Sequence, residues 1–392
     1  MSRKPRRIRR RVAVVTGTRA DYGILRSPME AIAGHGELEL RLVVTGMHLL
    51  RKFGHTVDEI LRDGWTVDVR AGMQKGDDDA LDQASGLGRG VSRIARFLHD
   101  AEIDIVLVLG DRIEAMAGAL AAVTTGRIVA HIHGGDVAPG DFDDSFRHAI
   151  TKLAHIHLTA TQAARRRIIQ MGEPPRRVHC VGAPGLDRLL TLRKHDARRR
   201  RGSGERNAIV LHHPCGRSAA FEHRVMRRLL RSVDAHGLRR TIVYPNSDRG
   251  HAGIIAAIDE HRAGAANGSV RVERSIDRDD YLRMLIDADV IVGNSSSGII
   301  EAAAARTRAV NVGDRQRGRE RDAGWVVDAD ESSSSIERAL ARALGKRPIT
   351  RRRSVYGAGR SGIKIADVLA GVRLDEALRR KQSVFPGVRW LT

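Results

Sequence analysis

The strongest constraint on the fold is a repeated alternation of short, continuous apolar runs with amphipathic segments. The β-branched run 12–15 is followed by a helix-like stretch at 22–33. The same order recurs downstream, where apolar runs lie at 40–45, 103–109, 128–132, 156–159 and 178–181. Runs that are apolar throughout, rather than at every second residue, are typical of strands buried on both faces. Because parallel strands need helical crossovers, the alternation predicts an α/β fold with a parallel sheet covered by helices on both sides.

A change of composition divides this alternation into two halves. Residues 193–206 are rich in Arg, Gly and Ser, which is typical of a linker, and the alternation then restarts at 208–211. A chain of 392 residues also exceeds what one hydrophobic core usually serves. The sequence therefore predicts two Rossmann-like domains, 1–195 and 206–360, that face each other across a cleft in a GT-B arrangement. We expect the segment 361–392 to form a C-terminal helix that packs back on the N-terminal domain.

Composition narrows the class of protein and its compartment. Hydrophobic residues make up 42% of the chain and charged residues 29%, which is the balance of an ordinary globular protein. No apolar run approaches the roughly 20 residues that cross a bilayer, and the basic N-terminus lacks the apolar stretch of a secretory signal. The only cysteines, Cys180 and Cys215, have no CxxC spacing. We therefore expect a cytoplasmic protein without membrane association, disulfides or structural zinc.

The formal net charge of +21 raises the question of nucleic-acid binding. Much of the excess lies in the arginine-rich runs 3–11, 198–201 and 351–353. These runs lack interleaved aromatic residues, and no helix-turn-helix, zinc-finger or RRM pattern accompanies them. The sequence therefore favours solvated arginines over specific nucleic-acid binding, and a basic background attracts anionic substrates.

Two loops at predicted strand ends of the first half carry candidate ligand groups. The segment 16–23, TGTRADYG, combines a glycine turn with a helix start that offers N–H groups to an anion, and Arg19 is a possible phosphate partner. The segment 110–114, GDRIE, places Asp111 and Glu114 at a second helix start. Plain structural roles also fit, namely a βα turn in the first segment and a capping box in the second.

The densest polar cluster combines HIHGGD at 131–136 with DDSFRH at 143–148. Alternation along a strand predicts that His131 and His133 share a face. Polar side chains buried at a strand end are costly without partners, so the cluster indicates a site. Both metal binding and proton transfer use His and Asp, but the spacing matches no metal signature. We therefore favour acid–base chemistry and predict no metal.

Strand ends of the second half offer groups suited to a nucleotide. His213 is held extended by the proline that follows it, and Asn246 follows a predicted strand. The segment 293–298, GNSSSG, opens a predicted helix, where hydroxyl and N–H groups suit a diphosphate. Glu301 in that helix suits a ribose diol, and Arg315 suits a phosphate. A rim histidine, a turn and a serine-rich N-cap are the structural alternatives.

Together these segments resemble one family, the hydrolysing UDP-N-acetylglucosamine 2-epimerases of sialic-acid-type pathways. The matching stretches occur in the family's order and span nearly the whole chain: TGTRADYG (16–23), GDRIEAMA (110–117), HIHGGD (131–136), DDSFRHAITKLAHIH (143–157), NSSSGIIEA (294–302) and NVGDRQRGRE (311–320). The fourth and fifth are the most specific. The resemblance implies a GT-B fold that holds the UDP-sugar mainly through its second domain, no cofactor, and a homodimer or homotetramer.

The resemblance also implies a role for each matched position. The sugar is expected to react near Asp111, His133, Asp143 and His48. The substrate-binding positions are Arg19, Asp21, Arg112, Glu114, His213, Asn246, Asn294, Ser295, Ser296, Gly298, Glu301 and Arg315. The implied reaction removes the C2 proton and expels UDP from C1 to give a 2-acetamidoglycal. Water then adds, C2 is protonated on the opposite face, and N-acetylmannosamine is released. Which candidate is the acid and which the base stays open.

Two positions depart from the family pattern, and other functions stay open. Asp136 stands where a glutamate is common, and His133 stands where some relatives carry glutamate. The nearest alternative is a hydrolysing 2-epimerase for another nucleotide sugar, such as UDP-N,N′-diacetylbacillosamine. A non-hydrolysing epimerase is disfavoured because those relatives usually carry an EAG-type sequence in place of HIHGGD. A glycosyltransferase and a basic nucleic-acid-binding module with an inactive fold are further alternatives.

Overall fold

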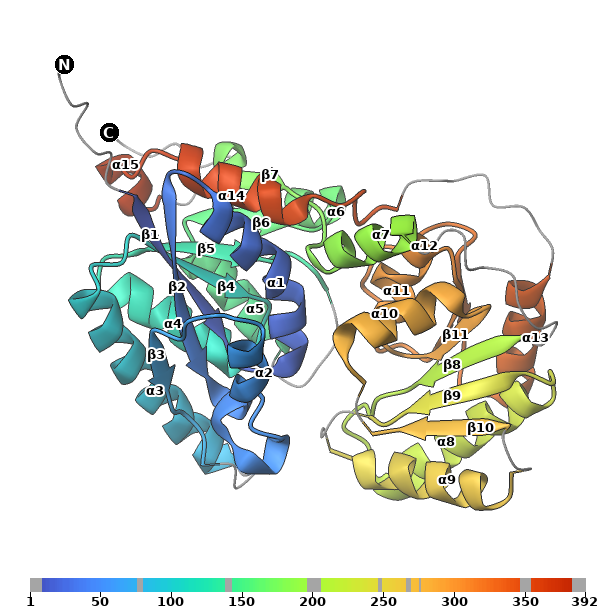
Figure 1. The fold of residues 1–392 in the computed structure, drawn as a ribbon. Coiled ribbons are helices and arrows are strands. Elements are labelled where there is room, and N and C mark those ends of the chain that lie inside the picture. The colour runs from blue at the N-terminus through green and yellow to red at the C-terminus, as the bar shows by residue number, and fades with distance from the viewer. Residues whose placement is uncertain are drawn as a thin grey trace. The chain divides into compact units, whose positions relative to one another are not determined.

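The computed structural model describes residues 9–75, 80–137, 143–195, 206–245, 249–265, 269–274, 276–345 and 354–382, without the side chains of Ala80 and Asp143. The chain divides into two compact units (Figure 1). Unit 1 takes its residues from 1–136, 142–185 and 360–392, and unit 2 from 137–141 and 186–359. Each unit is built around one parallel sheet with interleaved helices, so the predicted α/β class with two Rossmann-like domains is confirmed.

The sheet of unit 1 has seven parallel strands in the order β3-β2-β1-β4-β5-β6-β7. Its strands are β1 (Arg10–Thr16), β2 (Leu38–Thr45), β3 (Val69–Ala71), β4 (Ile105–Leu109), β5 (Ile128–Ile132), β6 (Ile156–Thr159) and β7 (Val178–Cys180). The strand order reverses direction beside β1, so the carboxyl ends of β1 and β4 lie next to each other at the switch point where α/β sheets bind ligands.

The helices of unit 1 follow the predicted alternation. They are α1 (Arg19–Gly34), α2 (Val57–Arg62), α3 (Ala80–Asp100), α4 (Ile113–Thr124), α5 (Asp143–Leu153), α6 (Gln162–Gln170), α14 (Ser361–Gly371) and α15 (Glu376–Arg379). Short 3₁₀ turns lie at Gly46–Leu49, Arg51–Phe53 and Pro175–Arg177.

Both faces of this sheet are buried. Along β1, Val12 and Val14 belong to one hydrophobic cluster, whereas Ala13 and Val15 belong to the cluster on the opposite face. Strand alternation makes this division, because successive side chains point to opposite sides of a sheet. Each fully buried aliphatic side chain contributes about 1.5–3 kcal/mol of transfer free energy. The double burial is the reason that the central residues of β1, 12–15, are all apolar rather than apolar at every second position.

The C-terminal helix α14 packs within unit 1 beside α1 (Figure 1). Ile365 and Leu369 of α14 share a hydrophobic cluster with Leu25 and Met29 of α1. The Arg10 guanidinium donates to the Leu369 carbonyl at 2.8 Å and thereby ties the helix to the start of β1. The last part of the described chain is therefore an integral part of the N-terminal sheet domain.

The sheet of unit 2 has six parallel strands in the order β10-β9-β8-β11-β12-β13. Its strands are β8 (Asn207–Leu211), β9 (Arg239–Val243), β10 (Val270–Glu273), β11 (Val290–Gly293), β12 (Arg308–Val312) and β13 (Val326–Ala329). Its helices are α8 (Ala219–Asp234), α9 (His251–Ala263), α10 (Arg278–Asp287), α11 (Ser296–Ile300), α12 (Ala302–Ala305) and α13 (Ser333–Leu344).

Helix α7 (Gly185–His195) precedes the linker but packs almost entirely with unit 2. Arg188 forms an ion pair with Asp279 at the start of α10, and Arg193 donates to the Ala304 carbonyl in α12. The units therefore divide after residue 185, upstream of the linker that composition indicates. Tertiary contacts of α7, which a local change of composition does not report, set this division.

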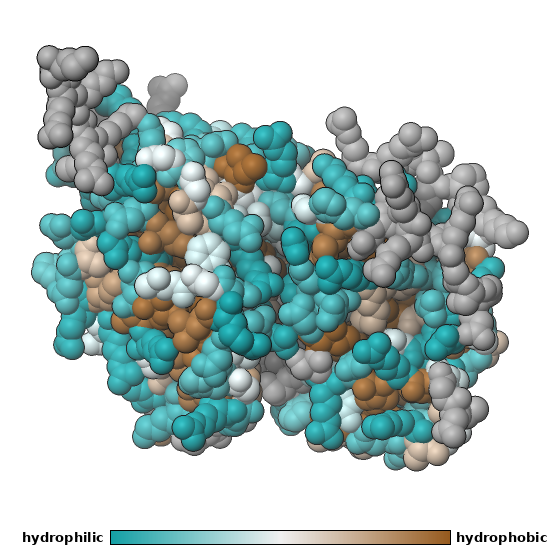
Figure 2. Space-filling model, in the orientation of Figure 1, coloured by the Kyte–Doolittle hydropathy of each residue, from teal (hydrophilic) through white to brown (hydrophobic). Residues whose placement is uncertain are grey.

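Apolar residues are largely internal. The face drawn in Figure 2 is mostly hydrophilic, and its hydrophobic residues lie in separate small patches. Within the described ranges, no helix is both long and apolar enough to cross a membrane.

Candidate functional site

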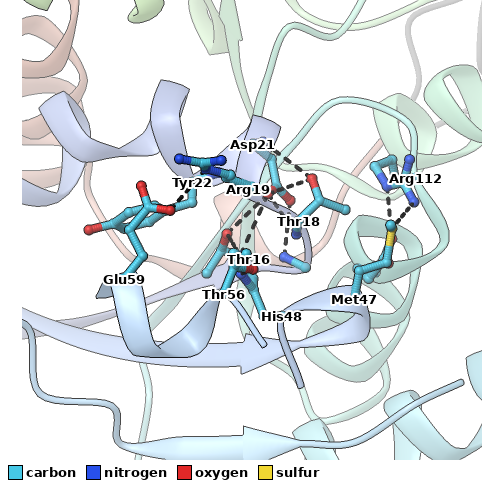
Figure 3. A network of polar contacts seen from close by, with 12 residues as sticks. Thr16, Thr18, Arg19, Asp21, Tyr22, Met47, His48, Thr56, Glu59 and Arg112 are labelled. Atoms are coloured by element: carbon cyan, nitrogen blue, oxygen red, sulfur yellow. Dashed lines mark hydrogen bonds and ion pairs between the residues drawn. The ribbon is translucent and has the colours of Figure 1, made fainter. Parts of the chain in front are cut away.

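The loop between β1 and α1 is shaped by the carboxylate of Asp21. This carboxylate accepts hydrogen bonds from the backbone N–H groups of Gly17 at 3.0 Å and Thr18 at 2.8 Å, and from the hydroxyl of Thr16 at 3.1 Å (Figure 3). Thr18 caps α1 and forms a capping box with Asp21. This loop contains two predicted substrate-binding residues, Arg19 and Asp21. The hydrogen bonds show that Asp21 holds the loop backbone in position.

His48 lies beneath this loop and is fully buried. Its Nε2 contacts the Thr16 hydroxyl at 3.0 Å, and its Nδ1 contacts the Thr56 hydroxyl at 2.7 Å (Figure 3). Because Thr16 donates its only hydroxyl hydrogen to Asp21, His48 donates from Nε2 and accepts at Nδ1. Burial lowers the pKa of His48, although the nearby Asp21 carboxylate opposes this shift. The structure therefore places His48 as a neutral link between two loops, with both ring nitrogens engaged.

Glu114 is buried against the backbone of two other strand-end loops. A Cβ atom at Gly17 would lie 2.3 Å from its Cγ, and one at Gly46 would lie 2.4 Å from its Oε1. Glycine at both positions thus leaves the space that this side chain fills. The carboxylate accepts hydrogen bonds from Arg112 and from Gln74, each at 3.3 Å. Glu114 joins the loops after β1, β2 and β4 and orients Arg112.

Helix α4 does not begin with the capping box that its sequence allows. Arg112 is the N-cap residue and makes no side-chain cap hydrogen bond, so Asp111 lies outside the helix. The Arg112 guanidinium also contacts the Met47 sulfur at 3.5 Å (Figure 3). The other arginine candidate, Arg19, forms an ion pair with Glu59 at 2.9 Å (Figure 3). The structure thus gives both arginines protein partners near the carboxyl ends of the strands.

Asp111 is held by a residue that sequence reasoning does not assign to the site. The guanidinium of Arg147 in α5 forms ion pairs with Asp111 and with Asp144, and it donates to the Asp136 carbonyl at 3.2 Å. The side chain of Arg147 is only 2% exposed, whereas that of Asp111 is 23% exposed. The spacing of Asp144 and Arg147 on a helix is visible in the sequence, but the contact with Asp111 is not.

The two histidines of HIHGGD have different environments. β5 ends at Ile132, and His133 adopts a left-handed backbone with φ of 62°. The prediction that His131 and His133 share a strand face is therefore wrong, because the strand does not continue through His133. Such a conformation is unfavourable for a side chain with a Cβ and is concentrated at functional sites.

The His133 ring is oriented by a carboxylate. Its Nδ1 lies 3.1 Å from Asp136 Oδ2, and this geometry leaves Nε2 as the nitrogen that can exchange a proton with a ligand. Asp111 and His133 follow neighbouring strand ends, where the N–H of Gly110 donates to the Ile132 carbonyl at 3.0 Å. Two proton-transfer candidates, Asp111 and His133, are thus brought to one edge of the sheet.

His131 is an internal group. Its Nε2 donates to the Gly110 carbonyl at 2.7 Å, and burial lowers its pKa to about 3. Two further predicted residues are not placed. The side chain of Asp143, the first residue of α5, and the whole of Asn246 lie outside what the structure describes.

In unit 2, the side chain of Asn294 joins two strand-end loops. Its oxygen accepts from the backbone N–H of His213 at 2.7 Å, and its amide nitrogen donates to the His213 carbonyl at 2.8 Å. Arg315 and Gln316 donate to the Asn294 carbonyl at 3.3 and 3.0 Å. Burial, assisted by the nearby Arg315 charge, lowers the pKa of His213 to about 3. His213 is thus a neutral ring beside a cationic side chain.

The predicted helix after β11 is interrupted at Glu301. α11 ends at Ile300 and α12 begins at Ala302. The Ser295 hydroxyl caps α11, Ser296 begins it, and Gly298 lies against β11 and β12, where a Cβ would meet Ala309 at 3.7 Å. The structure therefore gathers the predicted residues His213, Asn294, Ser295, Ser296, Gly298, Glu301 and Arg315 around the ends of β8, β11 and β12.

The buried histidines should make the folded state sensitive to acid. Burial lowers the pKa to about 4 for His155 and His212 and to about 3 for His131 and His213. Below pH 6.5 the unfolded chain binds protons that the folded chain does not, so stability is full above pH 6.5 and falls as the pH drops. Each group should cost up to about 2 kcal/mol between pH 7 and 5.

Urea unfolding at pH 7 and pH 5 would measure this loss. The variant His212→Gln should show a smaller difference between the two pH values than the wild-type protein. The matched variant His55→Gln, which replaces a histidine whose side chain is 37% exposed, should not. Equal unfolding free energies of the wild-type protein at both pH values would contradict the assignment of neutral buried rings.

Comparison with known proteins identifies the family. Residues 30–370 match the family model described as UDP-N-acetylglucosamine 2-epimerase. The chain is 32% identical over 381 residues to the UDP-N,N′-diacetylbacillosamine 2-epimerase (hydrolyzing) of Legionella pneumophila, covering 96% of this chain and 100% of that protein. It is 33% identical over 345 residues to the UDP-N-acetylglucosamine 2-epimerase of Neisseria meningitidis serogroup B, covering 86% of this chain and 89% of that protein.

A solved structure supports the same fold. The crystal structure of UDP-GlcNAc 2-epimerase from Neisseria meningitidis bound to UDP-GlcNAc superposes with a TM-score of 0.75 at 16% sequence identity. The superposition covers 92% of this chain and 99% of that one. The family model and the two relatives cover most of the chain, and residues 30–370 include the strand-end loops described above except the one between β1 and α1. The chain therefore belongs to the UDP-N-acetylglucosamine 2-epimerase family.

Proposed function

We propose that this protein is a hydrolysing 2-epimerase that converts a UDP-linked 2-acetamido sugar into UDP and the free 2-epimer of that sugar. The observation that carries the proposal is the arrangement around Arg147. This buried guanidinium holds Asp111 at the end of β4, and the His133–Asp136 pair follows the neighbouring strand. Oriented carboxylate and imidazole groups are suited to removing and returning the C2 proton.

The reaction begins with transfer of the C2 proton to a base of unit 1. The electrons of the C2–H bond form the C1–C2 double bond of a 2-acetamidoglycal, and the C1–O bond breaks to release UDP. A water oxygen then bonds to C1, and C2 receives a proton on the opposite face. Asp111, His133 and Asp143 are the proposed proton-transfer groups, and His48 positions the neighbouring loops. The sequence is redox-neutral and needs no redox cofactor.

Departure of UDP needs positive charge and hydrogen-bond donors at the diphosphate. We assign the nucleotide to unit 2, where His213, Asn246, Asn294, Ser295, Ser296, Gly298, Glu301 and Arg315 form the proposed UDP site. Arg315 supplies charge, and the neutral His213 ring supplies a hydrogen-bond donor. Arg19 and Arg112 of unit 1 are assigned to the sugar and diphosphate, with Asp21 and Glu114 holding their loops.

Two UDP sugars are candidate substrates. UDP-N-acetylglucosamine is the substrate that the family description names. UDP-N,N′-diacetylbacillosamine is the second, because the Legionella pneumophila protein with that name is similar along its whole length. Both sugars carry the 2-acetamido group and the C2 proton that the reaction needs. Their products suit sialic-acid-type sugar synthesis.

Proton and phosphorus NMR in deuterated water tests the reaction with each sugar in turn. UDP together with a free 2-epimer that carries deuterium at C2 is the expected result for the true substrate. A product still linked to UDP would reassign the protein to non-hydrolysing epimerisation. No reaction with either sugar, despite UDP binding, would refute the proposed activity. Comparison of kcat/KM for the two sugars identifies the preferred one.

Location and assembly are part of the proposal. The free cysteines Cys180 and Cys215 suit a reducing compartment, and UDP sugars are cytoplasmic metabolites, so we place the enzyme in the cytoplasm. We propose a homodimer or homotetramer, which light scattering coupled to size-exclusion chromatography would resolve.

The variant Arg315→Ala should weaken UDP binding at least tenfold. The substitution removes a guanidinium that lies next to His213 and Asn294, and charge-assisted hydrogen bonds to phosphate are among the strongest available. Titration calorimetry with UDP measures the effect. The exposed Arg317, two residues along the chain, is a matched control, and Arg317→Ala should bind UDP within twofold of the wild-type protein. Unchanged UDP affinity of Arg315→Ala would remove Arg315 from the site.

A further inference from the structure

Helix α10 contributes two side chains to the environment of Glu301. The Arg278 guanidinium forms an ion pair with the Glu301 carboxylate. The Tyr281 hydroxyl donates to Ser297 Oγ at 2.5 Å, and the Ser297 hydroxyl donates to Glu301 Oε2 at 2.6 Å. Tyr281 therefore donates a hydrogen bond to Ser297, and Ser297 donates one to Glu301. Arg278, from the same helix as Tyr281, forms an ion pair with the same carboxylate.

This group is shielded from water. Tyr281 is 9% exposed, Glu301 is 7% exposed, and the side chain of Arg278 is 21% exposed. Burial raises the pKa of Tyr281, so its hydroxyl stays protonated and able to donate. Although burial opposes it, the Glu301 carboxylate raises the pKa of Arg278, so the guanidinium stays charged. A buried carboxylate without such a cation would be strongly unfavourable.

The position of the pair matters because Glu301 is next to the proposed diphosphate loop. The Ser295 hydroxyl, which caps α11, accepts from the N–H of Ser297, and Ser297 in turn binds Glu301. A carboxylate at this place can accept hydrogen bonds from the hydroxyls of a ribose. Its negative charge, however, repels the diphosphate of the same nucleotide. Compensation of that charge is therefore a requirement for tight binding of a nucleoside diphosphate.

We propose that Arg278 is a positioning residue for nucleotide binding: it orients the Glu301 carboxylate toward the ribose and offsets the charge of that carboxylate near the diphosphate. The inference rests on the proposed function, which assigns Glu301 to the ribose. A carboxylate has about four acceptor positions. Arg278 and Ser297 together donate three hydrogen bonds to the Glu301 carboxylate, and the remaining position is left for a ribose hydroxyl. Arg278 acts through Glu301 and need not touch the nucleotide.

Titration calorimetry with UDP, on the full chain and without any sugar, tests this inference. The variants are Arg278→Met, Arg278→Lys, Glu301→Gln and the double variant of Arg278→Met with Glu301→Gln. Arg283→Met is the matched control, because Arg283 lies on the same helix, pairs with Asp280 and has a side chain that is 43% exposed. Thermal unfolding of each variant reports whether the fold is retained.

We expect Arg278→Met to weaken UDP binding at least tenfold and Glu301→Gln to weaken it by a similar factor. The double variant should bind UDP within threefold of Glu301→Gln alone, because the charge that Arg278 compensates is then absent. Arg278→Lys keeps the charge and should recover affinity to within about threefold of the wild-type protein. Arg283→Met should bind as the wild-type protein does.

Two results would overturn the inference. Wild-type affinity of a folded Arg278→Met would show that Arg278 has no role in binding. An equal loss on Arg278→Met in the wild-type and Glu301→Gln backgrounds would mean that Arg278 acts on the nucleotide directly. The calorimetry is independent of turnover. If the wild-type protein binds UDP with the expected variant pattern but epimerises neither sugar, the proposed reaction fails and this inference is supported.

Discussion

The variant Asp111→Asn should bind UDP with wild-type affinity and turn over at least a hundredfold more slowly. Asparagine has nearly the same shape but cannot accept a proton from C2, and loss of a general base costs about 10²–10⁴ in rate. The fold should survive, because Arg147 keeps its second carboxylate partner, Asp144, and its bond to the Asp136 carbonyl. Calorimetry with UDP and NMR detection of C2 deuteration measure the two properties separately.

Asp58→Asn serves as the matched control for Asp111→Asn. The Asp58 side chain is 61% exposed and pairs with His55 at the surface, so this variant should turn over normally. Wild-type turnover by Asp111→Asn would remove Asp111 from the proton-transfer step and leave His133 and Asp143 as the remaining candidates. Loss of UDP binding would instead assign Asp111 to the nucleotide.

The variant Arg147→Met should lose both stability and turnover. Removing one partner of a fully buried ion pair typically costs about 3–5 kcal/mol. The cost here should be smaller, about 1–3 kcal/mol, because the two carboxylates that lose their common cation, Asp111 and Asp144, have side chains that are 23% and 32% exposed. The same change releases Asp111 from its orientation, so kcat should fall at least a hundredfold even for the folded fraction. Urea unfolding and single-turnover kinetics at low temperature measure the two effects.

Two controls separate the roles of charge and geometry at Arg147. Arg147→Lys keeps the charge but cannot reach both carboxylates with a planar fork, so it should regain more stability than turnover. Arg380→Met removes a surface arginine whose side chain is 79% exposed and pairs with Glu376 at 2.7 Å, and it should cost no more than about 1 kcal/mol. Full turnover by Arg147→Met would contradict the view that Arg147 positions Asp111.

The strand-end motifs were readable from the sequence because they depend on local pattern. Continuous apolar runs identify strands that are buried on both faces, and the polar residues after them lie at the carboxyl edge of the sheet by topology alone. Asp111 after β4 and His213 after β8 were found in this way. The sequence analysis does not predict the Asp144–Arg147 pair, although residues three apart on a helix are neighbours and their spacing is visible in the sequence.

Backbone conformation at the strand ends was less predictable. The sequence pattern continues the strand through His133, yet the φ of 62° at this residue ends the alternation and separates its environment from that of His131. Glu114 reads as a capping-box residue, but it fills the space left by two glycines in other loops. For Glu114, contacts with distant segments outweigh the local preference that the sequence expresses.

The sequence by itself determined the α/β class, the two halves and the places where polar side chains leave the sheets. Only the tertiary structure decided which charged side chains form ion pairs. Arg147 contacts Asp111 across two elements, and Arg278 contacts Glu301 from a neighbouring helix. The physical reason is that periodicity specifies neighbours within one helix or strand, whereas the distance between side chains on different elements depends on how those elements pack.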